Sequence, residues 1–151
     1  MDNHSKKQIK VIEGFGDEWK KIDQSKISEV EHKELFNRYF SIFPFSNINH
    51  KSIGFDLGCG SGRWAKLVAP KVKKLYCVDP SNAIEIAKKN LSKFNNCIFL
   101  KNSVQNIKIK NESMDFGYCL GVLHHVDDPL QGISNCVKKL KYNAPFLIYL
   151  Y

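Results

Sequence analysis

Three glycines at alternating positions, Gly58, Gly60 and Gly62, form the part of this sequence whose residue types most clearly indicate a binding site. They follow an apolar run that contains Asp56, and they precede a segment with helical spacing. Glycine tolerates positive φ, and it lacks the Cβ atom that would keep a flat ligand away from the backbone. A tight turn alone needs only one glycine, and each further glycine costs stability. We therefore expect residues 57–63 to bind a ligand.

The charges beside these glycines indicate the kind of ligand. A dinucleotide-binding loop, G-x-G-x-x-G/A, has a small third residue where the helix N-terminus faces a pyrophosphate. Arg63 occupies that position here, and Asp56 lies two residues before the first glycine. A carboxylate is unfavourable beside a pyrophosphate and favourable beside an amino group and a sulfonium. The charges therefore favour S-adenosylmethionine over NAD.

A second carboxylate, Asp79, follows the apolar run at residues 74–78 and lies 21 residues after Gly58. In nucleotide-binding sheets, a carboxylate at the tip of the second strand accepts hydrogen bonds from both ribose hydroxyls. Asp79 could also cap the helix expected to begin near Asn82. The two roles are compatible.

Apolar runs alternate with amphipathic segments from residue 51 onward. This alternation indicates the fold that positions the glycine-rich loop and Asp79. Parallel neighbouring strands need long crossover connections, usually helical, so this alternation predicts an α/β fold with a parallel sheet. We expect strands at residues 52–57, 74–78, 97–100, 115–120 and 144–151. We expect helices at residues 63–69, 82–94 and 129–140.

Residues 1–50 differ from the remainder, because they are polar and helix-prone. We expect one amphipathic helix that ends near Pro44, preceded by a short segment around the sequence GFGDEW. We therefore divide the chain into a helical N-terminal extension, residues 1–50, and a ligand-binding domain, residues 51–151. The aromatic residues of the extension either pack in the core or form a lid over the site: Phe15, Trp19, Phe36, Tyr39 and Phe40.

Composition excludes several classes of protein. The 151 residues, 43% hydrophobic and 25% charged, are typical of one ordinary globular domain. No segment approaches the roughly 20 apolar residues of a membrane span, and the first residues lack an apolar signal-peptide core. We therefore expect a cytoplasmic protein. The five cysteines show neither a C-x-x-C motif nor a zinc-site spacing, so we expect reduced, buried thiols and no metal site.

The formal net charge of +8 comes mainly from lysines that are scattered along the chain. Only two arginines are present, Arg38 and Arg63, so no arginine cluster is available to bind phosphates or guanine edges. A solvated surface is the favoured interpretation of this charge, and nucleic-acid binding is the alternative.

The motifs together resemble those of a known family. The pattern D-x-G-C-G-x-G at residues 56–62, the later strand that ends at an aspartate, and MDFGYCLGVLHHVDDP at residues 114–129 resemble class I S-adenosylmethionine-dependent methyltransferases. They are most similar to the broad group that includes the ubiquinone and menaquinone C-methyltransferases. The resemblance covers residues 51–151, and it implies a Rossmann-like three-layer sandwich with a mostly parallel sheet. Relatives continue beyond the fifth strand, so we expect the domain to be incomplete at its C-terminus.

The resemblance also implies roles for individual residues. Asp56 and the glycine-rich loop would surround the methionine and ribose parts of S-adenosylmethionine. Asp79 would hold the ribose hydroxyls, and Pro80 would pack beside the adenine. Leu120 and Gly121 would flank the sulfonium and the transferred methyl group.

The loop after the third strand departs from the family. Ser103 stands where many relatives place an aspartate that accepts a hydrogen bond from the adenine amino group. The backbone N–H of Val104 and the side chain of Gln105 are the remaining candidates for an adenine contact. The implied cofactor-binding residues are Asp56, Gly58, Cys59, Gly60, Asp79, Pro80, Ser103, Val104 and Leu120.

Two adjacent histidines, His124 and His125, follow the fourth strand near the expected approach of the acceptor. Methyl transfer is an in-line displacement at an activated carbon, so positioning supplies much of the acceleration. A base is needed only where the acceptor must lose a proton, and an imidazole can take it at neutral pH. The alternative is that the pair shapes the loop. Asp127 and Asp128 are expected to cap the following helix.

The function these features predict is methyl transfer from S-adenosylmethionine to a small organic acceptor, at a carbon or oxygen atom. The Asn-Pro-Pro-Tyr or Asp-Pro-Pro-Tyr motif of amino-group methyltransferases does not follow the fourth strand. Two alternatives remain: an inactive or truncated cofactor-binding module, and an NAD-dependent oxidoreductase. The exposed edge of the fifth strand predicts self-association.

Overall fold

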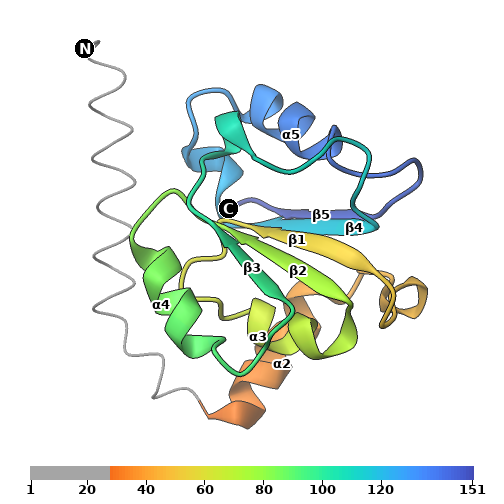
Figure 1. Cartoon of the computed structure of the whole chain (residues 1–151), viewed down its shortest axis with the longest axis vertical. Helices are drawn as coiled ribbons and strands as arrows, with labels where there is room; N and C mark the ends of the chain where they lie inside the picture. The colour runs from red at the N-terminus through yellow and green to blue at the C-terminus, as the bar shows by residue number, and fades with distance from the viewer. Residues whose placement is uncertain (1–27) are drawn as a thin grey trace.

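The computed structural model describes residues 28–151, which form a five-stranded sheet with helices on both faces (Figure 1). The strands lie in the order β3-β2-β1-β4-β5, and all four neighbouring pairs are parallel. The predicted α/β class and parallel sheet are therefore confirmed. The strands are β1 (Ile53–Leu57), β2 (Lys74–Val78), β3 (Cys97–Leu100), β4 (Phe116–Leu120) and β5 (Phe146–Tyr149).

Two hydrophobic clusters, one on each face of the sheet, join the layers. On one face, β2 and β4 pack against α2 (Glu29–Tyr39), α3 (Ala65–Val68) and α4 (Ala83–Asn90). On the other face, β1 packs against α5 (Pro129–Val137) and the 3-10 turns that precede it. Figure 1 shows these as the layers below and above the sheet. The arrangement is the expected three-layer sandwich.

Two glycines in the central strands make room for rings of the neighbouring strand. Gly54 of β1 pairs with Phe116 of β4, and Phe55 pairs with Gly117. A Cβ atom at Gly54 would lie 2.2 Å from the Phe116 ring, and one at Gly117 would lie 2.3 Å from the Phe55 ring. Large and small side chains thus alternate between β1 and β4. The two strands therefore pack closely, and their carboxyl ends form part of the site.

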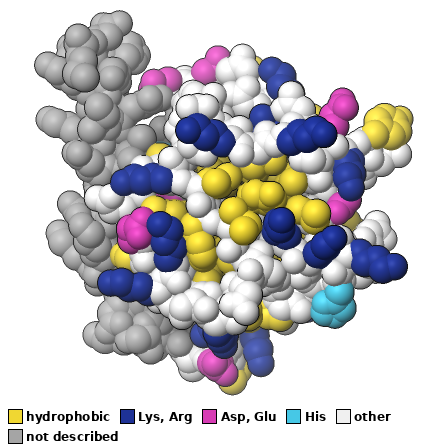
Figure 2. Space-filling model, in the orientation of Figure 1, with side chains coloured by type: hydrophobic (Ala, Val, Ile, Leu, Met, Phe, Trp, Pro, Cys, Tyr) yellow, Lys and Arg dark blue, Asp and Glu magenta, His cyan; other side chains and the backbone are white. Residues whose placement is uncertain are grey.

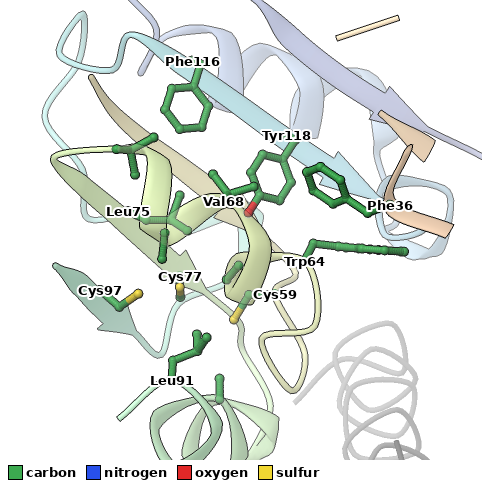
Figure 3. Close-up of a cluster of buried hydrophobic side chains, with 14 of the residues drawn as sticks. Phe36, Cys59, Trp64, Val68, Leu75, Cys77, Leu91, Cys97, Phe116 and Tyr118 are labelled. Carbon is green, nitrogen blue, oxygen red and sulfur yellow. The ribbon is translucent and has the colours of Figure 1, made fainter. Parts of the chain in front are cut away.

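All five cysteines are buried and free, as the sequence predicts. Figure 3 shows three of them, Cys59, Cys77 and Cys97, side by side below the aromatic part of one cluster. The aromatic part includes Phe36 of α2 and Trp64, so the part of the N-terminal extension that the structure describes packs directly on the domain.

The helices are shorter than the sequence periodicity predicts. The first helix ends at Tyr39 instead of near Pro44, because the chain turns after Phe40 and enters a short 3-10 segment. The helix expected at residues 63–69 has only four α-helical residues before a 3-10 turn that contains Pro70. The segment around GFGDEW, with Phe15 and Trp19, lies outside the described residues.

Charged side chains are spread over the face of the molecule that Figure 2 shows. Lysine and arginine side chains lie around a hydrophobic area there instead of forming one basic patch. Within residues 28–151, no helix is long and apolar enough to cross a membrane.

Candidate functional site

A cavity of about 270 Å³ opens at the carboxyl ends of the strands. Leu57 ends β1, Leu120 ends β4 and Tyr149 ends β5, and all three line the cavity; Asp79 and Asn102 follow β2 and β3. In open α/β sheets, ligands bind outside the carboxyl ends where the strand order reverses. The order here reverses between β1 and β4, and the cavity lies at that point.

The glycine-rich loop forms part of the cavity wall, and two of its glycines are required by close approaches within the protein. Gly58 has φ +71° and Gly62 has φ +81°, a region that side chains with a Cβ atom rarely adopt. A Cβ atom at Gly58 would lie 2.2 Å from Val122, and one at Gly62 would lie 2.7 Å from Leu91, which follows α4. The loop is therefore held against α4 on one side and against the segment after β4 on the other.

Asp79 faces the glycine-rich loop and fixes its shape. Its Oδ2 accepts a hydrogen bond from the Gly60 N–H at 2.9 Å, and its Oδ1 accepts from the N–H and the hydroxyl of Ser81 at 2.9 and 2.6 Å. Asp79 is 7% exposed and lines the cavity. A carboxylate offers about four acceptor positions, so these three bonds leave capacity for a ligand hydroxyl. The predicted capping role belongs to Ser81, whose hydroxyl accepts from the Ala83 N–H at the start of α4.

Asp56 lies beneath the loop, outside the cavity wall, and is fully buried. Among residues 28–151, its Oδ2 has no hydrogen-bond partner, and neither has the buried hydroxyl of Tyr118, which lies near the carboxyl without forming a hydrogen bond of good geometry. Burial raises the pKa of Asp56 from 3.8 to about 8; the neighbouring Tyr118 hydroxyl opposes that rise and the charge of Asp79 adds to it. The charge of Arg63 already lowers the pKa of this carboxyl, and a further cationic group nearby would lower it more.

The segments after β2 and β3 supply a less charged part of the wall. Pro80, Ser103, Val104 and Gln105 all line the cavity. Val104 begins a short 3-10 turn, and the Asn135 side chain of α5 donates to its carbonyl at 3.2 Å. The loop that departs from the family pattern thus does lie at the cavity.

The two histidines occupy different positions. His125 lines the cavity, whereas His124 does not, although their ring centroids are 3.8 Å apart. Loss of water around the ring lowers the pKa of His125, and the adjacent His124 adds to this, so the His125 imidazole is mainly neutral at neutral pH. Asp128 accepts from the Gln131 N–H at 2.9 Å, which confirms it as the cap of α5.

The structure brings most of the sequence-predicted site residues to one cavity. Those in its wall are Gly58, Asp79, Pro80, Ser103, Val104, Leu120 and His125. Those behind or beside the wall are Asp56, Cys59, Gly60 and His124.

Sequence reasoning missed an aromatic part of the wall. Trp64, Tyr149 and Tyr151 line the cavity. Tyr39 of α2 lines it too, and from the sequence this residue could either pack in the core or form part of a lid. The guanidinium of Arg63 lies 4.1 Å from the centre of the Trp64 ring and also lines the cavity. A signal was present for the tyrosines, because residues at the end of a parallel strand lie where ligands bind.

Comparisons with known proteins agree with this geometry. Residues 55–148 match a family model described as a methyltransferase domain, Methyltransf_11. A ubiquinone biosynthesis O-methyltransferase of Saccharophagus degradans is 32% identical over 57% of this chain and 38% of its own length. An uncharacterized RNA methyltransferase of Clostridium acetobutylicum is 27% identical over 86% of this chain and 28% of its own length.

A solved structure shows the same fold. Phosphoethanolamine N-methyltransferase 1 of Haemonchus contortus, in complex with phosphoethanolamine and S-adenosylhomocysteine, aligns over 97% of this chain and 33% of its own, with a TM-score of 0.71 and 14% identity. The chain therefore spans about a third of the length of these similar proteins.

Proposed function

The chain belongs to the Methyltransf_11 family of methyltransferase domains, and from that premise we propose that its cavity binds S-adenosylmethionine for methyl transfer to a small organic acceptor. The observation that carries the proposal is the position of Asp79, which lines the cavity and holds the glycine-rich loop. Family membership supports the cofactor, while the choice of acceptor rests on the cavity itself.

The residues of the cavity fit this cofactor. Asp79 would accept a hydrogen bond from a ribose hydroxyl through its one remaining acceptor position. Pro80 and Val104 would contact the adenine from the segments that follow β2 and β3. Asp56, buried and without a partner for Oδ2, would compensate the amino group of the methionine part.

The protein contributes mainly position and a proton acceptor to the transfer. The bound cofactor supplies a methyl carbon that its positive sulfur activates. Leu120 and Gly121 form the wall at the end of β4, where an acceptor can be held in line. The neutral imidazole of His125, in the same wall, would take a proton from a hydroxyl or carbon acid.

The acceptor we propose is small and is methylated on carbon or oxygen. The cavity lies just below the range of roughly 300–1,000 Å³ usual for small-molecule sites. The segment after β4 carries neither of the two Pro-Pro-Tyr motifs that favour amino-group acceptors.

RNA is a second candidate acceptor, favoured by the net charge of +8 and by the relative named as an RNA methyltransferase. Filter binding of a labelled RNA hairpin at two salt concentrations distinguishes an RNA acceptor from a small-molecule acceptor. A small-molecule enzyme should show only weak binding that is lost at physiological salt, whereas binding that survives there would favour RNA.

The experiment that tests the cofactor proposal is calorimetric titration of the chain with S-adenosylhomocysteine. We expect one ligand per chain, with affinity at least about tenfold weaker for Asp79→Asn, because the amide replaces a charged acceptor. Glu85→Gln, an exposed substitution on α4 outside the cavity wall, is the matched control and should bind like the unaltered chain. Absence of binding by the unaltered chain would contradict the proposal.

A further inference from the structure

Three segments that are far apart in the sequence bring aromatic side chains to one end of the cavity. We call this set the aromatic end: Tyr39 of α2, Trp64 before α3, and Tyr149 and Tyr151 at and after the end of β5. The ring centroids of Tyr39 and Trp64 are 5.1 Å apart, those of Tyr39 and Tyr149 are 4.8 Å apart, and those of Tyr149 and Tyr151 are 6.1 Å apart. The four rings therefore form one continuous surface.

This surface differs from the aromatic core beside it. Phe36, Phe40 and Phe43 are 3–7% exposed and pack within the protein. Tyr149 is 39% exposed, although it lines a cavity and contacts Tyr39. Burying such rings against a ligand is favourable, and aromatic rings pair best in stacked or edge-to-face arrangements. The aromatic end thus favours a flat ring as its ligand.

The charged side chains in the cavity wall indicate which charge the ring of an acceptor can carry. Among the described residues that line the cavity, Asp79 is the only carboxylate, and it belongs to the polar part that follows β2. At the aromatic end the charged group of the wall is Arg63, stacked on Trp64. A cationic acceptor would meet a like charge there, whereas a neutral or anionic one would not.

The positions of the wall residues along the cavity indicate the side from which an acceptor would reach the transferred methyl group. Leu120 and Gly121 lie at the end of β4, between the polar part and β5. The Gly121 N–H donates to the Tyr149 carbonyl at 2.9 Å, and a Cβ atom at Gly121 would lie 3.1 Å from the Tyr151 ring. The aromatic end therefore begins beside the place proposed for the transferred methyl group.

We propose that the aromatic end is the acceptor subsite, and that it selects a flat aromatic ring, neutral or anionic, by stacking against Tyr39 and Tyr149. This inference rests on the proposed function, since the cofactor must fill the polar part and leave the aromatic end open. The tyrosines position the acceptor, and His125 lies in the same wall to accept its proton.

The test uses the chain saturated with S-adenosylhomocysteine and two carboxylate probes of known shape, flat 2-naphthoate and saturated cyclohexanecarboxylate. Calorimetry should show 2-naphthoate binding at least about tenfold more tightly, without displacing S-adenosylhomocysteine. Tyr149→Leu and Tyr39→Leu should each weaken 2-naphthoate by about fivefold to tenfold, and Tyr149→Phe should retain it within about twofold. Tyr142→Leu, at a residue 94% exposed and outside the cavity wall, is the matched control and should change nothing.

The outcomes separate this inference from the proposed function. Failure of S-adenosylhomocysteine to bind would overturn both. If S-adenosylhomocysteine binds but both probes bind equally, or 2-naphthoate competes with it, the acceptor subsite alone is overturned. Unchanged affinity for 2-naphthoate in both Tyr39→Leu and Tyr149→Leu would also overturn the acceptor subsite alone.

Discussion

At the scale of single residues, Asp56 is unusual because folding removes its carboxyl from water and leaves Oδ2 without a hydrogen bond. Such a group binds a proton more tightly in the folded chain than in the unfolded one, which raises its pKa. We propose that a cationic part of the ligand accounts for a residue that otherwise costs stability.

We predict that Asp56 makes the chain less stable as pH rises. Between its unfolded pKa near 3.8 and its folded pKa of about 8, the folded state holds a proton that the unfolded state has released. The stabilisation is therefore complete below about pH 4 and is lost by about pH 8, a change on the order of a few kcal/mol. Urea unfolding at several pH values measures it.

The Asp56→Asn variant is the control for that prediction, since it removes the titration and keeps the shape of the side chain. The difference in unfolding free energy between the variant and the unaltered chain should grow with pH across this window. A difference that is constant with pH would show that Asp56 does not titrate as described.

A second prediction at this scale concerns cofactor binding. If the amino group of S-adenosylhomocysteine lies near Asp56, binding at pH 7 should release a proton, because a nearby cation lowers the pKa of a carboxyl. Calorimetry in phosphate and in Tris, which differ in ionisation enthalpy, should give different binding enthalpies. Identical enthalpies in the two buffers would place the amino group elsewhere.

At the scale of elements, the loop between β1 and α3 depends on contacts with its neighbours. Gly58 approaches Val122 after β4, and Gly62 approaches Leu91 after α4. The Asn90 side chain of α4 also donates to the Ser61 carbonyl at 3.0 Å. The cavity wall is thus preorganised by packing and by hydrogen bonds before any ligand arrives.

We predict that Gly58→Ala destabilises the chain by roughly 2–4 kcal/mol, since it adds positive-φ strain to a steric overlap with Val122. Thermal and urea unfolding measure the loss. The double variant Gly58→Ala with Val122→Ala should recover the steric part and leave about 1–2 kcal/mol of backbone strain. Equal stability of Gly58→Ala and the unaltered chain would contradict this description of the loop.

At the scale of the whole molecule, the edge of the sheet at β5 bears on self-association. The Pro145 and Tyr149 carbonyls accept from Gly117 and Gly121 of the β4 segment, and within residues 28–151 no strand pairs with the outward backbone groups of Phe146 and Ile148. We predict association that increases with concentration in light scattering. Ile148→Pro, which removes an outward N–H, should reduce it, whereas no association at any concentration would contradict the prediction.

The sequence predicted the strands more closely than the helices or the site. Strands β2 and β3 have the predicted bounds, because short apolar runs between polar turns leave little choice of register. The helix expected at residues 82–94 ends at Asn90, since its last turn is decided by contacts and not by periodicity.

The site was predictable only where one motif carries it. The glycines and Asp79 lie close together in the sequence, and the roles proposed for them follow from residue types. The aromatic end joins Tyr39 to Tyr149 across more than one hundred residues, and only the order of the strands brings them together. Long-range convergence of this kind is not visible in a local pattern.

A crystal structure of the chain with S-adenosylhomocysteine would show directly whether the cavity binds the cofactor. We expect a ribose hydroxyl to donate to Asp79, the adenine to lie beside Pro80 and Val104, and the sulfur to point toward Gly121. A ligand bound elsewhere, or a cavity in which Asp79 contacts only Gly60 and Ser81, would contradict the assignment of this cavity.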